Sequence, residues 1–582
     1  MKRKFVQIAA LCLSASLLIV TGGRQSVSAV SSDTSGRTIR VGLHHNGPYG
    51  TGTMEGLNLK NETGSGFRFG YYDGSNRFVE LDSTGETAIS VVKAANVWYG
   101  SYNGYTSYHS ALTTSGTAVG EYHLELPGAY GTCGEARSAA ADAGGFPACI
   151  GGEYYARIGS YTTRDQAKAA QAAWAEQGVR TEVKGTSQYG VNAVVTGTDT
   201  ILFQFDDLGS GTGLGVEPDG PGAGDPDVKY ITLSKNRLYY GGFRFERIGG
   251  GNMTVVNILD LDDYVKGVVP TEMSDSWPIE ALKAQAVAAR SYALSLGANH
   301  GGSHFDICDN THCQAYTGRT RAGSNSDAAV EQTAGQVVLY NNRVAQTFYY
   351  SSNGGASESV SVVWGSNQSS YPYLVGKADP YEAASGVKND YTRTVSAGEL
   401  ASKLKNLGYH EVGSSIVSVA VVSLTDAGNP KQLTFTDNNG TKVTVNTRFV
   451  KDMLGLGSYR YGLASAVSAS SGVSVNGEAP SDSAGLYAIS GNGDTVPVTG
   501  DIYALTGGGT VLLGQDGSAP AGGGIGNLGS TTGNNGSFTF IGKGWGHNVG
   551  MSQWGAYAMA NQGKTYRDIL QFYYTGITVG FM

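Results

Sequence analysis

A long apolar-periodic run near the middle of the chain predicts a helix from about residue 279 to residue 296. Its apolar positions recur at three- and four-residue steps and so share one buried stripe: Ile279, Leu282, Ala286, Ala289, Ala293 and Leu296. Pro278 suits the first turn, where its missing N–H costs nothing. Asp275 and Ser276 are both acceptable capping residues, and the pattern does not choose between them.

Charged residues accompany this predicted helix. Glu272 and Asp275 lie in an extended polar segment just ahead of it. Lys283 and Arg290 are seven residues apart, so they project from similar angles about 10 Å apart along the axis. Such a pattern could hold charge in place. Periodicity alone favours a plainer surface helix, in which Glu280 and Lys283 form an i,i+3 pair and Glu272 balances the helix dipole.

The first part of the chain consists of strand-like runs and one helical pattern. Short β-prone stretches separated by Gly, Asn and Asp predict a β-rich region over 36–112. From 121 to 196 the order becomes strand, turn, helix and strand, with the helix at Arg164–Gln177 and Gly178 as its stop. The acidic, Gly-rich run 206–227 is typical of a linker.

The chain from 229 to 582 mixes strands and helices around the central helix. Strands are expected up to about residue 269, and a further helix is expected at Glu399–Tyr409. A Gly/Ser-rich stretch at about 465–537 predicts a long loop-like insertion. The whole pattern predicts a multi-domain, β-rich α+β protein with a central helix in its C-terminal domain and a small αβ module ahead of it.

Composition narrows the class of protein. At 582 residues the chain is too long for one core and suggests about three domains. Glycine supplies 87 residues, roughly double its usual share, and charged residues supply only 15 %, which fits many short strands and tight turns. The net charge of −8 argues against a duplex nucleic acid partner, because phosphate binding needs clustered Lys and Arg. A neutral glycan is compatible with this charge.

The N-terminus has the pattern of a secretory signal. Cations at residues 2–4 precede an apolar run from Phe5 to Val20, and the small residues up to Ala29 fit a cleavage site. The apolar run is shorter than the ~20 residues that a spanning helix needs, although an uncleaved anchor is the alternative. We therefore expect 1–29 to be a signal peptide and the mature protein to be secreted or held at the cell envelope.

Four separated motifs resemble, in the same order, those of the SpoIID/LytB family, the sporulation protein D and amidase-enhancer group that acts on bacterial cell walls. They are PTEMSDSWPIEALKAQAVAARSYAL at the central helix, DICDNTHCQAYTG at 306–318, YYSSNGGASES at 349–359 and GKGWGHNVGMSQWGAYAMA at 542–560. Four motifs in order are far more specific than any one alone. Asn548 stands where the family commonly has Gly.

The resemblance implies a lytic transglycosylase acting on peptide-free glycan, with Glu272 as its acid. Glycosidic cleavage needs a carboxylic acid to protonate the leaving oxygen. A lytic enzyme can use that single group, which then takes a proton from the muramic acid C6 hydroxyl and so closes a 1,6-anhydro ring. Asp275 is the near-sequence candidate for a second carboxylate and keeps hydrolysis open. Lys283 and Arg290 align with basic family positions that could bind the lactyl carboxylate or tune Glu272.

The later motifs supply candidates for sugar binding. Tyr349 and Ser351 are expected to contact sugar, because glycan sites combine aromatic faces with hydroxyl and amide partners. Trp545 could stack on a sugar ring, while His547 and Gln553 could line the cleft among glycines that allow close backbone approach. The alternatives are a plain Gly-Gly turn and a structural histidine.

Two imidazoles and two thiols lie within ten residues, at His304, Cys308, His312 and Cys313. A Cys2His2 set is a preferred zinc ligand set with tetrahedral geometry. The adjacent His312 and Cys313 need a turn to aim both side chains inward, and His300 lies close to His304. Because family members can bind zinc in this loop, the resemblance implies a structural zinc and no organic cofactor. A Cys308–Cys313 disulfide is the alternative in an exported protein.

The predicted module at 121–196 resembles a SPOR domain, which binds peptidoglycan glycan strands stripped of their peptides. Residues 158–161 and the Ala-rich helix after them carry this resemblance. The signature is diffuse, and any small αβ module is the alternative. Cys133 and Cys149 lie in the same region and could pair in an oxidising compartment.

The sequence therefore predicts a secreted peptidoglycan-remodelling protein of sporulation or cell-wall turnover, whose partner is the glycan strand. The alternative is a non-catalytic amidase enhancer that binds cell wall and stimulates an N-acetylmuramoyl-L-alanine amidase. A purely structural wall-binding protein would leave Glu272, Lys283 and Arg290 without a role. The partner amidase and the oligomeric state do not follow from the sequence.

Overall fold

The structure is a computed structural model that describes most of the chain after residue 35. The described residues are 36–47, 49–112, 116–220, 231–233, 237–296, 300, 304–464, 487–489, 495–497, 502–506, 509–513, 529–532 and 536–582. The predicted signal peptide and most of the predicted insertion lie outside them. In the described part the protein is a β-rich mixture of helices and sheets, which confirms the predicted fold class. No helix there is long and apolar enough to cross a membrane.

The described chain divides into two compact units, which we treat separately. The N-terminal unit contains the described residues up to Ser276, then Gln285–Val337 and the last two residues. The C-terminal unit contains Trp277–Ala284 and the described residues from Val338 to Gly580. The predicted domain at 229–582 is therefore shared between both units.

A seven-stranded sheet forms one layer of the N-terminal unit, in the order β20-β1-β19-β18-β15-β3-β4. Its strands are β1 (Thr38–His44), β3 (Gly66–Tyr72), β4 (Phe78–Thr84), β15 (Leu214–Asp219), β18 (Gly242–Glu246), β19 (Thr254–Asp260) and β20 (Ile307–Cys308). The linker predicted at 206–227 is thus wrong in part. Leu214 and Val216 are fully buried, and β15 pairs with both β3 and β18, a role that the Gly-rich composition concealed.

A second sheet of eight strands has the order β12-β9-β11-β10-β14-β13-β5-β2. Its strands are β2 (Gly56–Lys60), β5 (Ala88–Lys93), β9 (Tyr122–Glu125), β10 (Phe146–Ile150), β11 (Glu153–Tyr161), β12 (Glu182–Gly185), β13 (Val191–Val195) and β14 (Ile201–Asp206). Because β5 pairs with β13, the predicted regions 36–112 and 121–196 share one sheet and are not separate domains. Local periodicity does not report such long-range pairing.

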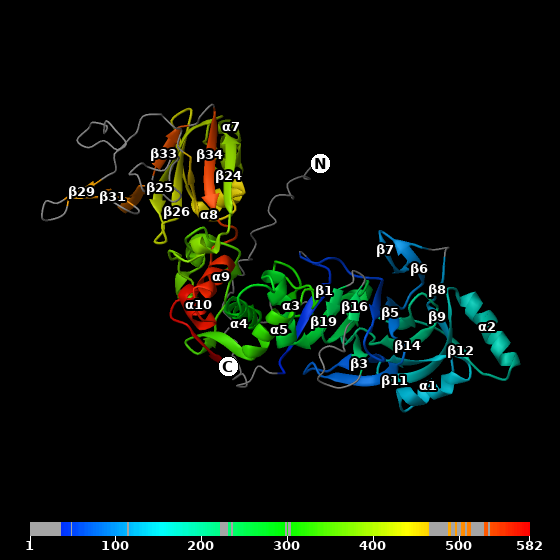
Figure 1. Cartoon of the computed structure of the whole chain (residues 1–582). Helices are drawn as coiled ribbons and strands as arrows, with labels where there is room; N and C mark the ends of the chain where they lie inside the picture. The colour runs from blue at the N-terminus through cyan, green and yellow to red at the C-terminus, as the bar shows by residue number, and fades with distance from the viewer. Residues whose placement is uncertain are drawn as a thin grey trace. The chain divides into compact units, whose positions relative to one another are not determined.

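The segment from β9 to β12 is a βαββαβ unit with antiparallel pairing in the order β12-β9-β11-β10. Its helices are α1 (Cys133–Ala141) and α2 (Arg164–Glu176), which lie alongside these strands (Figure 1). Thr163 and Gln166 form a capping box at α2, and Ala167 packs with Leu124 and Ile158. The predicted strand–helix–strand order is confirmed; α1 was not predicted.

The N-terminal unit also contains the helices next to the central motif. They are α3 (Leu261–Glu272), α5 (Ser324–Gln332) and the part of α4 (Ile279–Leu296) that follows Ala284. The strands predicted up to residue 269 therefore end too late. Asp260 is the N-cap of α3 and accepts a hydrogen bond from the Asp262 N–H at 2.7 Å. The strand therefore ends at Asp260, nine residues before the predicted end at residue 269. Short strands complete the unit: β6 (Val97–Tyr102), β7 (Tyr105–His109), β8 (Ala118–Val119), β16 (Ile231–Leu233) and β17 (Arg237–Tyr239).

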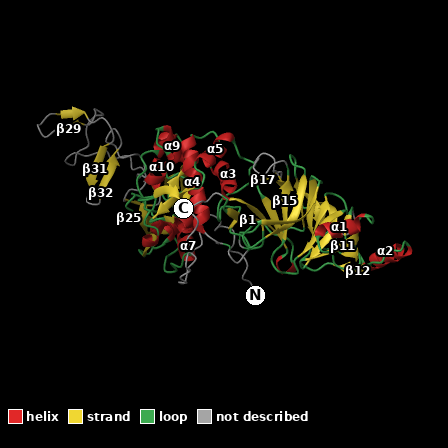
Figure 2. Ribbon diagram, turned by 90° about the horizontal axis from the view of Figure 1, so that it is seen from below, coloured by secondary structure: helices red, strands yellow, loops and turns green. Residues whose placement is uncertain are grey.

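The C-terminal unit combines small sheets with short helices. Its paired strands are β21 (Gln336–Tyr340), β22 (Arg343–Val344), β23 (Tyr349–Tyr350), β24 (Asp390–Ser396), β25 (Ile416–Leu424), β26 (Pro430–Asp437), β27 (Lys442–Asn446), β28 (Tyr461–Leu463), β34 (Ser537–Lys543), β35 (Met551–Ser552) and β36 (Thr578–Phe581). Its helices are α6 (Val360–Trp364), α7 (Ala397–Asn406), α8 (Thr447–Leu454), α9 (Gln553–Asn561) and α10 (Tyr566–Tyr573). The last two lie next to each other (Figure 2). The helix predicted at 399–409 corresponds to α7.

The predicted Gly/Ser-rich insertion is not wholly loop. It contains two hairpins, β29–β30 (Tyr487–Ile489, Thr495–Pro497) and β31–β32 (Ile502–Thr506, Gly509–Leu513). A fifth strand, β33 (Gly529–Thr532), pairs with β25 of the C-terminal unit. Glycine is permissive of strand as well as turn, so composition alone overstated the loop content.

A buried ion pair fixes α3 to the second half of α4 in the N-terminal unit. Arg290 is fully buried, and its Nε donates to Asp262 Oδ1 at 2.7 Å while its Nη1 donates to the Gln336 carbonyl at 3.0 Å. Burial lowers the pKa of the guanidinium, whereas Asp262 opposes that shift. Removing one member would leave the other charge in the core without compensation.

We therefore expect Arg290→Met to lower the free energy of unfolding by about 3–5 kcal/mol. Lys283→Met on the same helix is the control, because its ion pair with Glu280 is partly exposed and should cost about 1 kcal/mol. Urea unfolding followed by circular dichroism measures both. Equal losses in the two variants would contradict a stabilising role for the Arg290–Asp262 pair.

Candidate functional site

Glu272 is the last residue of α3, and its side chain is half-buried. The extended segment predicted to hold Glu272 and Asp275 is therefore wrong for Glu272, because α3 continues through Pro270 and the backbone becomes extended only at Met273, with φ −129°. The helix end is held by the Thr271 hydroxyl, which bonds to the Gly267 carbonyl and to Thr317 Oγ1, both at 2.9 Å. This places the candidate acid at a helix terminus that contacts the segment 306–318 through Thr317.

The segment 306–318 packs against α3 and supports it. Tyr264 donates to Gln314 Oε1 at 3.0 Å, and Tyr316 donates to Asn257 Oδ1 at 2.8 Å. All four residues are buried, so these bonds are shielded from water. Two motifs far apart in sequence thus fix the orientation of one helix.

Asp275 has a structural task. Its Oδ1 accepts the Ser326 N–H at 2.7 Å, and its carbonyl accepts from Asn325 Nδ2 at 3.0 Å. Ser326 lies in the first turn of α5, so Asp275 caps α5 rather than the central helix. The expectation that Asp275 caps the central helix is therefore wrong, whereas the alternative of Ser276 stays a prediction.

The two cations predicted to bind substrate are both engaged inside the protein. Arg290 is fully buried against Asp262, so its predicted contact with substrate is wrong. Lys283 Nζ donates to Glu280 Oε1 at 2.8 Å, and Glu280 Oε2 accepts the Tyr566 N–H at 2.8 Å. The plain i,i+3 pair is confirmed, and it connects the start of α4 to the start of α10. Charge pattern alone could not separate these roles from ligand binding.

The two glycine-rich motifs of the C-terminal unit pair directly. Tyr349 pairs with Met551 and Tyr350 with Ser552 in a parallel β23–β35 ladder. Trp545 and Ser352 exchange backbone hydrogen bonds of 2.8 and 3.1 Å. The sequence-predicted residues Tyr349, Ser351, Trp545, His547 and Gln553 are thereby gathered on adjoining strands, loops and the start of α9.

These predicted sugar contacts differ in exposure. Trp545 is 63 % exposed, so its ring is available for stacking. Tyr349 and Ser351 are half-buried, and Gln553 is buried. A further aromatic cluster joins Trp277, Trp554 and Tyr557, with ring centroids 4.7–5.4 Å apart. Sequence reasoning missed this cluster because Trp277 is distant along the chain.

His547 is held as a neutral ring. Its Nδ1 accepts the Val549 N–H at 3.1 Å, and the rings of Tyr350 and Trp364 lie with centroids 5.2 Å away. Burial lowers its pKa to about 4. His547 is therefore uncharged at neutral pH and offers hydrogen bonding and ring contact, not a positive charge.

Two buried carboxylates, Glu382 and Asp379, accept hydrogen bonds from the glycine-rich motifs of the C-terminal unit. Glu382 accepts the N–H groups of Asn353 and Gly354, each at 2.7 Å, and the Ser552 hydroxyl. Asp379 accepts from Asn353 Nδ2 at 2.7 Å and from the Tyr573 hydroxyl at 2.6 Å. Burial raises the pKa of Glu382. No periodicity or motif marked these two residues in the sequence.

The backbone conformation of Asn548 explains why asparagine can stand where the family commonly has glycine. It adopts φ +62°, a left-handed conformation that glycine and asparagine accept more readily than other residues. Its Nδ2 donates to the carbonyls of Asn353 and Ala356, and its Oδ1 accepts the Tyr459 N–H, each at 3.2 Å. The substitution preserves the loop and adds contacts to it.

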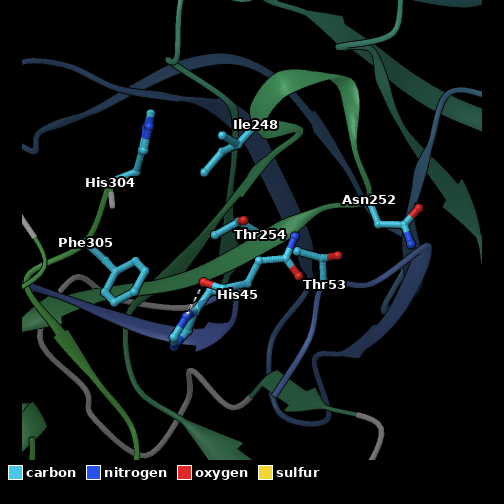
Figure 3. A pocket seen from close by; sticks show the side chains of 8 residues that line it. His45, Thr53, Ile248, Asn252, Thr254, His304 and Phe305 are labelled. Atoms are coloured by element: carbon cyan, nitrogen blue, oxygen red, sulfur yellow. Dashed lines mark hydrogen bonds between the residues drawn. The ribbon is translucent and has the colours of Figure 1, made fainter. Parts of the chain in front are cut away.

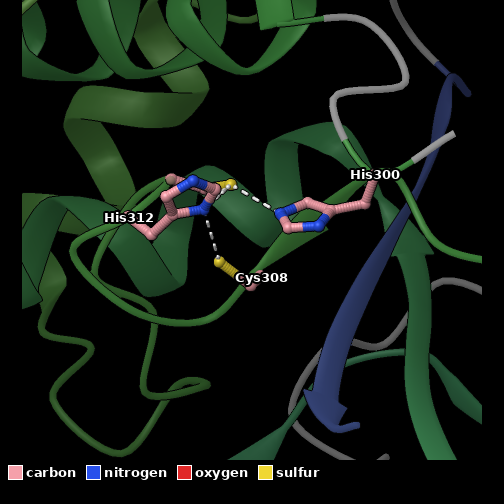
Figure 4. Close-up of side chains that lie close together, drawn as sticks. His300, Cys308 and His312 are labelled. Carbon is pink, nitrogen blue, oxygen red and sulfur yellow. Dashed lines mark hydrogen bonds between the residues drawn. The ribbon is translucent and has the colours of Figure 1, made fainter. Parts of the chain in front are cut away.

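The thiols and imidazoles of the N-terminal unit form a compact cluster (Figure 4). One ligand atom from each of His300, Cys308, His312 and Cys313 lies within 4.8 Å of the others. A turn at Asn310, where Oδ1 accepts the His312 N–H and the carbonyl accepts the Cys313 N–H, aims both residues inward. This is the turn that the sequence required.

His304 is not part of this cluster. Its Nδ1 lies 2.9 Å from Glu246 Oε1, so the predicted ligand His304 is wrong, and His300 occupies the position instead. Cys308 and Cys313 are free thiols, as are Cys133 and Cys149. Hydrogen bonding, first from Cys313, lowers the pKa of Cys308 to about 4. Two thiols, one readily ionised, and two imidazoles at this spacing fit tetrahedral zinc.

Comparison with known families identifies a class for the central part of the chain. Residues 249–340 match the family model described as SpoIID, Stage II sporulation protein. This stretch contains α3 with Glu272, α4, the cysteine–histidine cluster and α5.

Three relatives extend the comparison beyond that stretch. An uncharacterized protein of Brachyspira hyodysenteriae is 29 % identical over 59 % of this chain and 72 % of its own length. The amidase enhancer of Bacillus subtilis is 31 % identical over 54 % of this chain but only 40 % of its own length. Stage II sporulation protein D of Bacillus subtilis is 28 % identical over 56 % of this chain and 76 % of its own length. These similarities support the resemblance of this chain to the SpoIID family.

The left-handed backbone at Asn548 generates a stability prediction. Asn548→Ala should destabilise the protein by about 1–2 kcal/mol more than Asn548→Gly, because both lose the side-chain bonds but only alanine strains the backbone. In the exposed helix position Ala173, Ala173→Gly should instead destabilise. Thermal unfolding compares these variants. Equal stability of the two Asn548 variants would contradict the assigned conformation.

Proposed function

We propose that this protein is a peptidoglycan lytic transglycosylase that cleaves peptide-free glycan strands, with Glu272 as the acid. The observation that carries the proposal is the position of Glu272. It ends a helix that buried hydrogen bonds and an ion pair hold in place, in the segment that matches the SpoIID family model, and its side chain is accessible in part.

In this reaction Glu272 serves twice. As an acid it donates its proton to the glycosidic oxygen, and the bond between that oxygen and C1 of the muramic residue breaks. The resulting carboxylate takes the proton of the C6 hydroxyl of the same residue, whose oxygen bonds to C1 and closes the 1,6-anhydro ring. No water is consumed, and the acid returns to its starting form.

The position of Asp275 supports this route over hydrolysis. Hydrolases usually add a second carboxylate as nucleophile or as the base that activates water. Asp275, the nearest such group in sequence, caps α5 through the Ser326 N–H. Its structural engagement leaves the single-acid route as the better supported one.

For the glycan we propose contacts to uncharged and aromatic groups. Trp545 offers an exposed ring, while Tyr349, Ser351, His547 and Gln553 add hydroxyl, imidazole and amide groups. The neutral state of His547 suits sugar hydroxyls. The cluster of Trp277, Trp554 and Tyr557 is a second platform on which pyranose rings could stack.

We further propose that the βαββαβ segment binds glycan in the manner of a SPOR domain and that the protein is exported to the cell envelope. The order β12-β9-β11-β10 with two helices supports the first point, because it provides the small αβ module that the resemblance expects. The second rests on the sequence of residues 1–29.

A structural zinc is proposed for His300, Cys308, His312 and Cys313. Four protein ligands complete tetrahedral coordination and leave no open position for catalysis, so the metal would fix the loop that supports α3. The close approach of His300 Nε2 to Cys313 Sγ, at 3.3 Å, supports this set.

A second function is favoured by one comparison. The relative named amidase enhancer matches more than half of this chain. In that alternative the protein binds cell wall and stimulates an N-acetylmuramoyl-L-alanine amidase without cutting glycan. A purified amidase whose rate rises equally with wild type and with Glu272→Gln would favour it.

The catalytic assignment predicts a separation of activity from folding. Glu272→Gln should lower the rate of cleavage of peptide-free glycan by about 10²–10⁴-fold while the melting temperature and glycan binding stay unchanged. Asp275→Asn is the matched control, since asparagine also caps helices and should keep most activity. An equal loss in Asp275→Asn would instead indicate a two-carboxylate hydrolase.

The zinc assignment predicts about one zinc per chain by elemental analysis. Zinc should be lost in His300→Ala and in Cys308→Ser but retained in His304→Ala, which lies outside the cluster. A zinc-free protein with Cys308 and Cys313 oxidised to a disulfide would contradict this assignment, as would loss of zinc in His304→Ala alone.

A further inference from the structure

A small pocket of about 230 Å³ lies in the N-terminal unit (Figure 3). Two of its lining residues, His45 and Phe305, neighbour His300 of the metal cluster, with ring centroids 6.2 and 4.9 Å from that imidazole. Its lining comes from three separate segments: the loop after β1, the turn and strand that begin at Ile248, and residues 304–305. The volume is below the roughly 300–1,000 Å³ of sites for drug-sized ligands. It suits a ligand of about one sugar ring.

Two polar side chains of the pocket, His304 and Asn252, each use one polar atom in a contact within the protein and keep a second polar atom for a ligand. His304 Nδ1 lies 2.9 Å from buried Glu246, which leaves Nε2 with no partner among the described residues. Asn252 Oδ1 accepts from Lys93 Nζ at 3.1 Å, so its Nδ2 is left to donate elsewhere. His304 and Asn252 lie on opposite sides of Thr254, whose hydroxyl makes no bond within the described chain.

The backbone at His304 is held in an unfavourable conformation. Its φ of +68° is rare for a residue other than Gly, Asn or Asp. The Arg244 guanidinium donates to the His304 carbonyl, and Glu246 fixes the ring. Such outliers persist where the surroundings enforce them, and they cluster at ligand sites. Here the enforced conformation holds the imidazole against Glu246 at the edge of the pocket.

The charges at this pocket are already compensated. His304 faces Glu246, and Lys93 pairs with Glu55 at 2.7 Å. No uncompensated charge therefore remains in the lining to favour an ion. The exposed side chain of Ile248, 43 % accessible, adds an apolar contact beside the hydroxyl, amide and imidazole groups.

We propose that this pocket binds one neutral N-acetylhexosamine unit, through His304 Nε2, Asn252 Nδ2 and the Thr254 hydroxyl. Ile248 would cover an apolar face or the acetamido methyl group of the sugar. The identity of the sugar rests on the proposed glycan function, whereas the pocket and its unpaired polar groups do not. The pocket gives the N-terminal unit a sugar contact of its own.

The test uses the full chain carrying Glu272→Gln and Trp545→Ala, with N-acetylglucosamine as the probe in saturation-transfer NMR and calorimetry. His304→Asn and Asn252→Ala in this background should each weaken sugar binding at least tenfold. Asparagine is chosen because it tolerates positive φ. Lys60→Ala, at the end of β2 with a 59 % exposed side chain and outside the βαββαβ segment, is the control and should change nothing. Zinc content should be the same in all variants.

The outcomes separate this inference from the proposed function. Equal sugar binding in His304→Asn, Asn252→Ala and the control would overturn the pocket assignment even if Glu272 proves catalytic. Displacement of the sugar from the pocket is expected from chitotriose but not from phosphate or acetate; binding of those anions without binding of sugar would also overturn it. Loss of sugar binding in both variants, with no glycan cleavage by wild type, would support the pocket and reject the transglycosylase.

Discussion

The ion pair between Arg290 and Asp262 is the constraint on which the central site depends. A fully buried guanidinium must keep its carboxylate, so the second half of α4 and the first turn of α3 are fixed to each other. Glu272 ends the same α3, and Thr317 holds that end through Thr271. The candidate acid is thus positioned by a core charge pair at one end of its helix and by a hydroxyl contact at the other.

Buried charged groups also position the glycine-rich loops, where carboxylates accept hydrogen bonds that a neighbouring strand would accept in a sheet. Glu382 and Asp379 satisfy loop N–H and amide groups that have no strand partner, and Asn548 adds three side-chain bonds across the same loops. Exposed Trp545 can therefore lie on an irregular loop without loss of order. In both units, groups that do not touch the proposed glycan determine where the contacting groups lie.

The sequence predicted the parts of this protein that depend on local pattern. Periodicity predicted α2 and α4, and the resemblance to the SpoIID/LytB family implied sugar contacts from 349–359 and 542–560. It failed where partners are remote. The N-terminal strands β1 and β5 join sheets with β19 and β13, and β15 was hidden in glycine-rich sequence. Arg290 and His304 have partners, Asp262 and Glu246, far along the chain, so residue type could not separate core pairing from ligand binding.

The most direct measurement is the mass of the products released from peptide-free glycan strands by the wild-type protein. In a single-acid mechanism the C6 oxygen loses its proton and bonds to C1, so the products should be one water lighter than hydrolysis products and should end in 1,6-anhydromuramic acid. Products that carry the added water would contradict the assignment of Glu272 as the only carboxylate in the reaction. A folded, glycan-binding protein that releases no products would contradict catalysis itself.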